Sequence, residues 1–356
     1  MSAFSAFDEA MMRRALALAE KGLFTTTPNP RVGCVITQGE TIVAEGWHKR
    51  AGEPHAEAIA LKETGEKAQG ATVYVNLEPC NHYGRTPPCA GALINARVAR
   101  VVAALRDPNP QAALGGEALA AAGIRFEHGL LEEEARELNL GFLSRMQRGR
   151  PWVRLKIAAT LDGRSALASG ASQWITGPEA RRDGHRWRAR ACAVLTGAGT
   201  VTVDDPQLTV REVETPRQPL RVIVDSRLET PRKARILQGA RVLIFAAREG
   251  VAPQNAEVVV LPNAHGKVEL SRMLEELASR GINELHVEAG FRLNGSLTRE
   301  GCVDEFLVYL NPSFLGDKAL GMLDLPAAGT LEERLKLKLT SVERLGDDLR
   351  ILARPA

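Results

Sequence analysis

Three residues in the N-terminal half have the types and the order of a catalytic zinc site. His55, Cys80 and Cys89 offer one imidazole and two thiolates, a ligand set that suits Zn²⁺. Three protein ligands leave one coordination position for water, whose pKa falls toward neutrality on zinc. Glu57 lies two residues beyond His55 and is not needed as a ligand, so it can carry a proton from that water to a departing amine. The sequence therefore predicts hydrolytic deamination, with Glu57 as the catalytic residue.

The spacing of the two cysteines differs from the usual pattern of zinc base deaminases. Those enzymes carry His-x-Glu followed by Pro-Cys-x-x-Cys. Here residues 81–88 separate Cys80 from Cys89, so a longer loop must return the second thiolate to the metal. The alternative is a structural zinc with a fourth protein ligand, for which His48 and His82 are the candidates.

Length, composition and charge limit the class of protein. A chain of 356 residues exceeds what one core usually organises, so we expect two domains. The net charge of +3 argues against a nucleic-acid or membrane-surface partner. No apolar run is long enough to span a bilayer, and residues 1–8 lack the features of a secretion signal. The chain has five cysteines, two of them assigned to metal, which fits a reducing compartment, so we expect a cytoplasmic protein. The other three, Cys34, Cys192 and Cys302, are expected in the core.

Helix and strand signals alternate along the chain, which indicates an α/β layered fold. In the first half we expect helices over 5–21, 56–64 and 117–122, and strands over 32–37, 41–45, 72–77 and 100–105. The helix over 56–64 would carry Glu57 on the rigid element that starts at His55. A helix start after Pro79 would stabilise the Cys80 thiolate through its unpaired N–H groups.

The character of the chain changes near residues 148–151, so we predict domains over 1–148 and 149–356. Pro178 favours a helix start, because proline suits the first helical turn. In the second half we expect a helix over 270–279 and strands over 152–158, 193–196, 220–225, 241–245, 257–261 and 284–288.

Two glycine-bearing turns and one basic segment of the second half could bind phosphate. Residues 195–200 and 287–296 each run from a strand into a turn whose backbone N–H groups can hold a pyrophosphate. Neither is a G-x-G-x-x-G sequence, so the standard dinucleotide fold is not supported, and such turns are also common connectors. Residues 179–190 are rich in arginine, which binds phosphate in a bidentate manner, although most of these side chains can equally form a solvated helix face.

Several motifs occur together along nearly the whole chain. In the first half they occupy residues 28–33, 55–57, 78–89 and 107–110; in the second half they occupy residues 156–163, 172–176, 200–206 and 287–290. In combination they resemble the bifunctional deaminase/reductase family of riboflavin biosynthesis. The long spacing from Cys80 to Cys89 is part of this resemblance and differs from transfer-RNA and cytidine deaminases.

The resemblance implies a cytidine-deaminase-like N-terminal domain and a dihydrofolate-reductase-like C-terminal domain. The first would hydrolyse the 2-amino group of 2,5-diamino-6-(5-phosphoribosylamino)pyrimidin-4(3H)-one with Zn²⁺. The second would reduce 5-amino-6-(5-phosphoribosylamino)uracil to the ribitylamino product with NADPH. We therefore expect a small phosphoribosyl pyrimidine as substrate, no nucleic-acid or membrane partner, and a homo-oligomer.

The family's functional residues can be carried over by position. His55, Cys80 and Cys89 match its zinc ligands, and Glu57 matches its proton shuttle. The positions that match dinucleotide contacts are Ala158, Trp174, Thr200, Asp204, Ser226 and the turn formed by Gly290, Phe291, Arg292, Leu293, Asn294, Gly295 and Ser296. Those that match substrate contacts are Ser172, Arg188, Leu208, Arg211 and Glu288.

Three residues need separate treatment. Family members often carry Pro or Gly soon after the Ala-Gly step, whereas Phe291 and Arg292 stand here, so only a backbone role is inferred for that turn. Lys156 is expected on a strand near the pocket, where it could assist sugar opening or bind phosphate, although a surface lysine is the simpler interpretation.

Two other functions are compatible with the zinc ligands. A nucleic-acid base editor with a C-terminal docking domain would bind RNA or DNA with strong salt dependence. Its weakness is that aromatic residues make up only 4% of the chain and do not interleave with the basic ones. A non-catalytic module stabilised by zinc would keep its function after Glu57→Ala.

Overall fold

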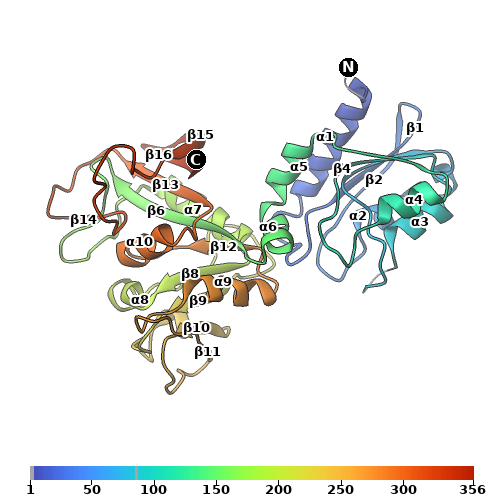
Figure 1. Ribbon diagram of the computed structural model, residues 1–356. Helices are drawn as coiled ribbons and strands as arrows, with labels where there is room; N and C mark the ends of the chain where they lie inside the picture. The colour runs from blue at the N-terminus through green and yellow to red at the C-terminus, as the bar shows by residue number, and fades with distance from the viewer. Residues whose placement is uncertain (1–3, 85–86) are drawn as a thin grey trace. The chain divides into compact units, whose positions relative to one another are not determined.

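The computed structural model describes residues 4–84 and 87–356, so Arg85 and Thr86 of the predicted zinc-site loop lie outside the described residues. The chain forms two compact α/β units, Met1–Gly149 and Arg150–Ala356 (Figure 1). Within the described residues, no helix is both long and apolar enough to cross a membrane. A two-domain α/β fold was the prediction, and it is confirmed.

The N-terminal unit is a five-stranded sheet with helices on both faces. The strand order is β2 (Thr41–Trp47), β1 (Gly33–Gln38), β3 (Thr72–Leu77), β4 (Arg100–Leu105) and β5 (Arg125–His128). Strand β1 is antiparallel to both of its neighbours, and β3, β4 and β5 are parallel. One face packs on α1 (Ala6–Glu20), α5 (Glu132–Leu138) and α6 (Leu140–Arg148). The other face packs on α2 (Ala56–Thr64), α3 (Cys89–Asn95) and α4 (Gly115–Ala121) (Figure 1). The short 3₁₀ helix η1 (Gly65–Ala68) follows α2.

The C-terminal unit is built on a nine-stranded sheet. Its order is β11 (Ala256–Val260), β10 (Val242–Ala246), β9 (Leu220–Val224), β8 (Ala193–Gly197), β12 (Glu284–Val287), β6 (Trp152–Thr160), β13 (Glu305–Asn311), β16 (Asp348–Pro355) and β15 (Leu337–Leu345). The strands from β11 to β13 are parallel, whereas β16 is antiparallel to β13 and to β15. The short strands β7 (Arg164–Ala166) and β14 (Leu320–Gly321) form a separate pair.

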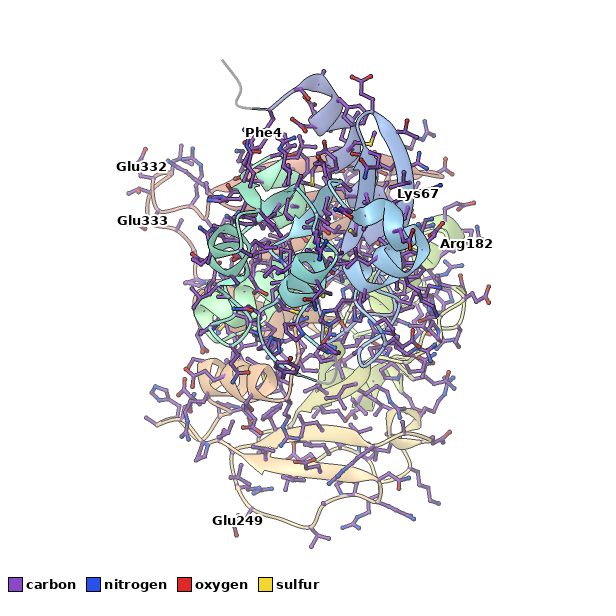
Figure 2. The ribbon with its side chains drawn as sticks, turned by 90° about the vertical axis from the view of Figure 1, so that its right-hand side faces the viewer. Phe4, Lys67, Arg182, Glu249, Glu332 and Glu333 are labelled. Carbon is purple, nitrogen blue, oxygen red and sulfur yellow. The ribbon has the colours of Figure 1, made fainter. Side chains whose placement is uncertain are left out.

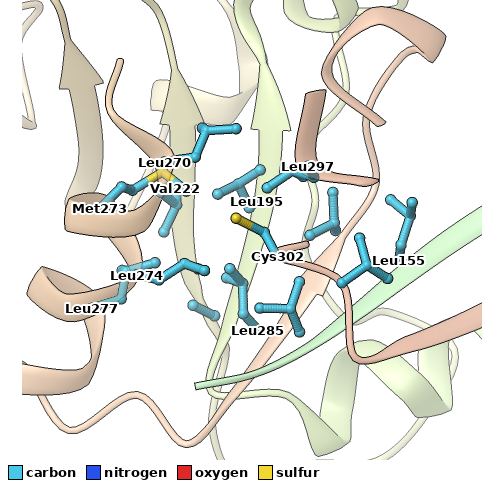
Figure 3. Packing of buried hydrophobic residues seen from close by; sticks show 14 of the residues in the cluster. Leu155, Leu195, Val222, Leu270, Met273, Leu274, Leu277, Leu285, Leu297 and Cys302 are labelled. Carbon is cyan, nitrogen blue, oxygen red and sulfur yellow. The ribbon is translucent and has the colours of Figure 1, made fainter. Parts of the chain in front are cut away.

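Helices cover both faces of this sheet, and the two faces differ in character. On one face the helices α9 (Leu270–Ser279) and α10 (Phe291–Arg299) enclose the main apolar core, in which Leu285 and Leu195 pack near Met273 and Leu277 (Figure 3). On the other face lie α7 (Pro178–Arg190) and α8 (Ala198–Asp204), and the 3₁₀ helix η2 (Arg235–Leu237) follows β9. The face under α7 carries charged side chains, which matter for the second active site.

Two predicted helices have the predicted bounds: α2 spans 56–64 and α9 spans 270–279. The helix start considered after Pro79 is not found, because residues 81–84, 87 and 88 are not helical and α3 begins at Cys89. The second thiolate, not the first, therefore lies at a helix N-terminus. The turn predicted over 290–296 is also shorter, since Gly290 is the N-cap of α10 and the residues after it are helical.

Candidate active sites

The three predicted zinc ligands come from two helix starts and one strand end. His55 is the N-cap of α2, Cys89 is the first residue of α3, and Cys80 follows the end of β3. The peptide N–H of Ala90 donates to the carbonyl of Cys80 at 3.1 Å, and that of Cys89 donates to the Cys80 sulfur at 3.5 Å. These bonds close the loop that the unusual cysteine spacing requires.

The spacing of the donor atoms fits a tetrahedral zinc. Nδ1 of His55 lies 3.5 Å from Sγ of Cys80 and 3.4 Å from Sγ of Cys89. Bonds of about 2.3 Å to sulfur and about 2.0 Å to nitrogen at tetrahedral angles place such atoms roughly 3.5 Å apart. Among the described residues, this trio is the group of His, Cys, Asp and Glu side chains close enough to share one ion. The residues therefore fit the metal that their sequence predicts.

The protonation of the two sulfurs supports the same conclusion. The hydrogen bond with Cys89 lowers the pKa of Cys80 to about 4, and the same contact raises the pKa of Cys89. The Cys80 sulfur also raises the pKa of His55. The buried donors thus compete for protons, a competition that a divalent cation between them removes.

Glu57 lies on the first turn of α2, next to these donors, and its side chain is buried. Burial raises the pKa of Glu57 to about 7, although the neighbouring His55 opposes the shift. A carboxyl group whose pKa lies near neutrality can both accept and release a proton under ordinary conditions.

A cavity of about 420 Å³ opens beside this cluster. Its lining includes His55, Glu57 and Cys80, together with polar side chains from three loops: Asn29, His48, and the pair Asp107 and Asn109. A volume of this size is within the range of small-molecule sites. The open side of the metal cluster therefore faces a space that a small substrate can enter.

His48 is not available as the fourth protein ligand of a structural zinc. Its Nδ1 donates to the Pro54 carbonyl at 3.1 Å, so its Nε2 accepts from the Asn29 amide at 3.0 Å. Both ring nitrogens are occupied, and neither His48 nor His82 belongs to the metal cluster within the described part of the chain. A cluster with three ligands is the arrangement of a catalytic rather than a closed structural zinc.

The sequence did not point to the residues that hold the loops around this cavity in place. The buried Glu78 carboxylate accepts from the N–H of Gly116 at 2.7 Å and from that of Asp107 at 3.1 Å. Gly115 permits a close approach to the zinc loop, since a Cβ there would lie 1.8 Å from the Pro79 carbonyl oxygen. The signal for Glu78 was its place immediately before Pro79, at the end of a buried strand.

The second candidate site lies at the carboxyl ends of parallel strands in the C-terminal unit. Thr200 is in α8 after β8, Ser226 follows β9, and Glu288 and Gly290 follow β12. Ligands of open α/β sheets bind at this edge, beside the point where the strand order reverses. Here β9 and β12 lie on opposite sides of β8, so the predicted residues surround such a point.

The structure brings several predicted contacts together. Nη2 of Arg188 lies 2.9 Å from Oε2 of Glu288, its Nε also binds that carboxylate, and its Nη1 donates to the Thr209 carbonyl at 3.2 Å. The hydroxyl of Ser172 donates to Asp204 at 3.4 Å. A Cβ at Gly290 would lie 3.4 Å from Oγ1 of Thr200, so α10 begins directly beside α8.

The remaining predicted contacts of the reductase lie in surroundings that range from exposed to buried. Trp174 is 70% exposed, with the Arg181 guanidinium 5.0 Å from the centre of its ring. Ser226 accepts a hydrogen bond from the N–H of Val268 at 3.2 Å. Leu208 is buried with a positive φ of 52°, and Ala158 lies in β6. Arg211 is exposed, and its N–H donates to His185 at 3.2 Å.

Lys156 is not the surface lysine of the simpler interpretation. Its side chain is 24% exposed, and Nζ lies 4.0 Å from Oε2 of Glu288. Burial lowers the pKa of Lys156, although Glu288 opposes this. By contrast, Arg182 and Arg186 of the basic segment are exposed, as expected of a solvated helix face, and Figure 2 shows Arg182 at the molecular surface.

Comparisons with known proteins agree with both sites. Residues 151–351 match the family described as the RibD C-terminal domain, and residues 5–105 match the cytidine and deoxycytidylate deaminase zinc-binding region. The riboflavin biosynthesis protein RibD of Escherichia coli is 47% identical, with 96% of this chain and 98% of that protein covered. The chain belongs to the RibD family. It is therefore a bifunctional deaminase and reductase of riboflavin biosynthesis, with zinc and NADPH as cofactors.

Solved RibD structures show the same two-domain fold. Acinetobacter baumannii RibD (form 1) is 42% identical and superposes with a TM-score of 0.92 over 98% of this chain and 99% of that one. The Thermotoga maritima diaminohydroxyphosphoribosylaminopyrimidine deaminase/5-amino-6-(5-phosphoribosylamino)uracil reductase is 35% identical, with a TM-score of 0.90 and the same coverage. The RibD of Haemophilus influenzae is 46% identical over 100% of this chain and 99% of its own. The predicted family, enzyme class and overall function are thus confirmed.

Proposed function

We propose that this RibD protein deaminates 2,5-diamino-6-(5-phosphoribosylamino)pyrimidin-4(3H)-one and then reduces the resulting 5-amino-6-(5-phosphoribosylamino)uracil. Residues 1–148 carry the deaminase and residues 149–356 the reductase. The observation that carries the proposal is the three-ligand cluster with Glu57 beside a cavity of about 420 Å³. The names of the Thermotoga relative's two activities support the substrate assignment.

In the deaminase, His55, Cys80 and Cys89 hold the metal, which supplies Lewis acidity when bound. Glu57 is the catalytic residue. It takes a proton from the attacking water and delivers it to the amine that leaves, for which a pKa of about 7 is suited. Its position in the first turn of α2, two residues beyond His55, fixes its distance from the metal ligands.

In the reductase, NADPH supplies the hydride, and the protein supplies alignment. The residues proposed to hold the cofactor are Ala158, Trp174, Thr200, Asp204, Ser226 and the segment from Gly290 to Ser296. The N-terminus of α10 supports this assignment, because its free N–H groups can bind the cofactor's phosphates where Gly290 leaves the backbone accessible.

The residues proposed to hold the substrate in the reductase are Ser172, Arg188, Leu208, Arg211 and Glu288. A guanidinium has five N–H donors, and Arg188 uses three of them in its bonds to Glu288 and Thr209. The two others remain for the substrate phosphate, with Arg211 as a second cation. Arg188 also keeps the pKa of Glu288 well below its usual range against the effect of burial, so this carboxylate stays ionised.

Arg188→Ala tests the phosphate assignment. We expect the reductase KM for the phosphorylated substrate to rise about tenfold or more, because a charge-assisted contact is lost, while deamination is unchanged. The matched control is Arg186→Ala, an exposed arginine on the same helix. Reductase kinetics should be measured with the ribotide and with its dephosphorylated riboside. A variant that discriminates between the two as strongly as the wild type would contradict the assignment.

We also propose that the enzyme is a homo-oligomer. Strand β15 lies at the edge of the large sheet and exposes Leu339 (61%) and Val342 (52%). Exposed apolar side chains on an edge strand favour association with another chain. Sedimentation should show a smaller species for Leu339→Lys than for the wild type, whereas Lys338→Ala on the same strand should not change the mass. An unchanged mass for Leu339→Lys would argue against this surface.

We further propose a cytoplasmic location without nucleic-acid or membrane partners. All five cysteines lie in the described part of the chain and none forms a disulfide, as expected in a reducing compartment. Cell fractionation and a low-salt filter-binding assay with RNA and DNA would test these two points. Secretion of the protein, or salt-dependent retention of nucleic acid, would contradict them.

A further inference from the structure

The sheet face beneath α7 is a layer of ion pairs. Arg154 of β6 is almost fully buried, with Nε at 2.6 Å from Glu305 and Nη1 at 3.1 Å from Glu284. Arg190 of α7 adds a bond of 2.7 Å to Glu284. Charges in this buried layer are paired, as the cost of desolvation requires.

His286 is the exception in this layer. It lies in the middle of β12, between Arg154 on β6 and Val194 on β8, and is fully buried. Neither of its ring nitrogens makes a regular hydrogen bond to a described residue. Burial lowers its pKa, so the ring is neutral and carries one N–H. An apolar side chain would fill this place without the free-energy cost of a buried unsatisfied group.

The nearest acceptor to this ring belongs to the reductase site. Nε2 of His286 lies 3.4 Å from Oε1 of Glu288, two residues farther along and on the same face of the sheet. Glu288 is otherwise approached by Arg188 from α7 and by Lys156 from β6, both of them cations. His286 thus places a neutral ring nitrogen against Oε1 of Glu288, from the strand that leads to this carboxylate, at a distance that a small adjustment turns into a regular hydrogen bond.

We propose that His286 is a positioning residue of the reductase: its Nε2–H holds Oε1 of Glu288 so that Oε2 keeps its orientation toward Lys156 and the substrate. This inference rests on the proposed role of Glu288 as a substrate contact. A neutral donor suits this place, because it restrains the carboxylate without adding a further positive charge beside Arg188 and Lys156.

Four variants test the inference: His286→Leu, His286→Gln, Glu288→Gln and the double change of His286→Leu with Glu288→Gln. We expect His286→Leu to raise the reductase KM about five- to tenfold with a smaller effect on kcat, and His286→Gln, which keeps an N–H donor, to recover most of that loss. In the Glu288→Gln background, His286→Leu should cause little further loss, because its effect acts through the carboxylate.

The controls separate positioning from general stability. Leu285→Ala opens a cavity on the opposite, apolar face of β12, so it should lower Tm and leave the reductase KM unchanged. Deamination by the same samples should be unaffected. If His286→Leu does not fold, His286→Met replaces it in the comparison.

The outcomes separate the positioning role of His286 from the proposed role of Glu288 as a substrate contact. A loss with Glu288→Gln but none with His286→Leu would overturn the inference alone. Equal losses for His286→Leu and His286→Gln, or a loss that adds fully to that of Glu288→Gln, would show that the ring only fills space. Wild-type kinetics for Glu288→Gln would overturn its proposed substrate role and the inference together.

Discussion

Glu57→Gln is expected to lower the deaminase kcat by roughly a hundred- to ten-thousandfold, because the amide cannot accept a proton from the attacking water. The Glu57 side chain is buried beside the metal ligands, whereas Glu63, the other carboxylate of α2, is exposed. No second carboxylate of this helix can therefore replace Glu57. Glutamine has nearly the same volume, which keeps the packing of the helix. Release of ammonia from the diaminopyrimidine ribotide is the measurement.

Two controls make this result specific. The Glu57→Gln protein should bind zinc at the wild-type stoichiometry, since Glu57 is not a ligand, and should reduce the pre-deaminated uracil ribotide at the wild-type rate. Glu63→Gln is a matched variant on the exposed side of α2 and should deaminate normally. If Glu57→Gln keeps most of its deaminase activity, another group carries the proton.

Cys89→Ser should abolish stoichiometric zinc binding together with deamination. The variant loses a thiolate ligand at the start of α3, and the N-terminal unit loses the free energy of metal binding that stabilises its loops. Zinc content by elemental analysis and Tm of the N-terminal transition are the measurements. We expect the reductase to be unaffected, because its residues lie in the other unit.

Cys34→Ala is the control for this experiment. Cys34 is fully buried in β1 and is not a ligand, so its loss should lower Tm but leave one zinc per chain. Removal of the metal from the wild type with a chelator should reproduce the Cys89→Ser result and be reversed by added zinc. A Cys89→Ser protein that retains one zinc per chain would show that the metal binds at other residues.

The zinc site could be predicted from the sequence because metal ligation requires particular donor atoms. An imidazole, two thiolates and a non-ligand carboxylate are rare in combination, and His55, Cys80 and Cys89 do meet within hydrogen-bond range. The helix start considered after Pro79 rested on a local rule. Proline permits a helix start, but the loop to Cys89 satisfies its backbone through long-range partners such as the Ala112 carbonyl, which accepts from the N–H of Asn81.

The reductase site was less accessible to sequence reasoning. Strand β6 lies between β12 and β13, which follow it by more than a hundred residues, so no local pattern places Lys156 beside Glu288. Charged residues on β6 and β12 are typical of exposed strands, yet here they face α7 in a buried layer of ion pairs. Strands β13, β15 and β16 were not predicted for the same reason, since long-range pairing determines them. Helix α10 was missed because residues 290–296 were read as a glycine-bearing turn.

Product analysis by mass spectrometry tests the account most directly. The purified protein is incubated with the diaminopyrimidine ribotide in water enriched in ¹⁸O, with and without NADPH. We predict that one amino group is replaced by ¹⁸O without NADPH, and that the same product gains two hydrogens when NADPH is present. Reduction of the ribotide with its amino group retained, or no deamination until NADPH is added, would contradict a water-dependent deaminase and a separate reductase acting in this order.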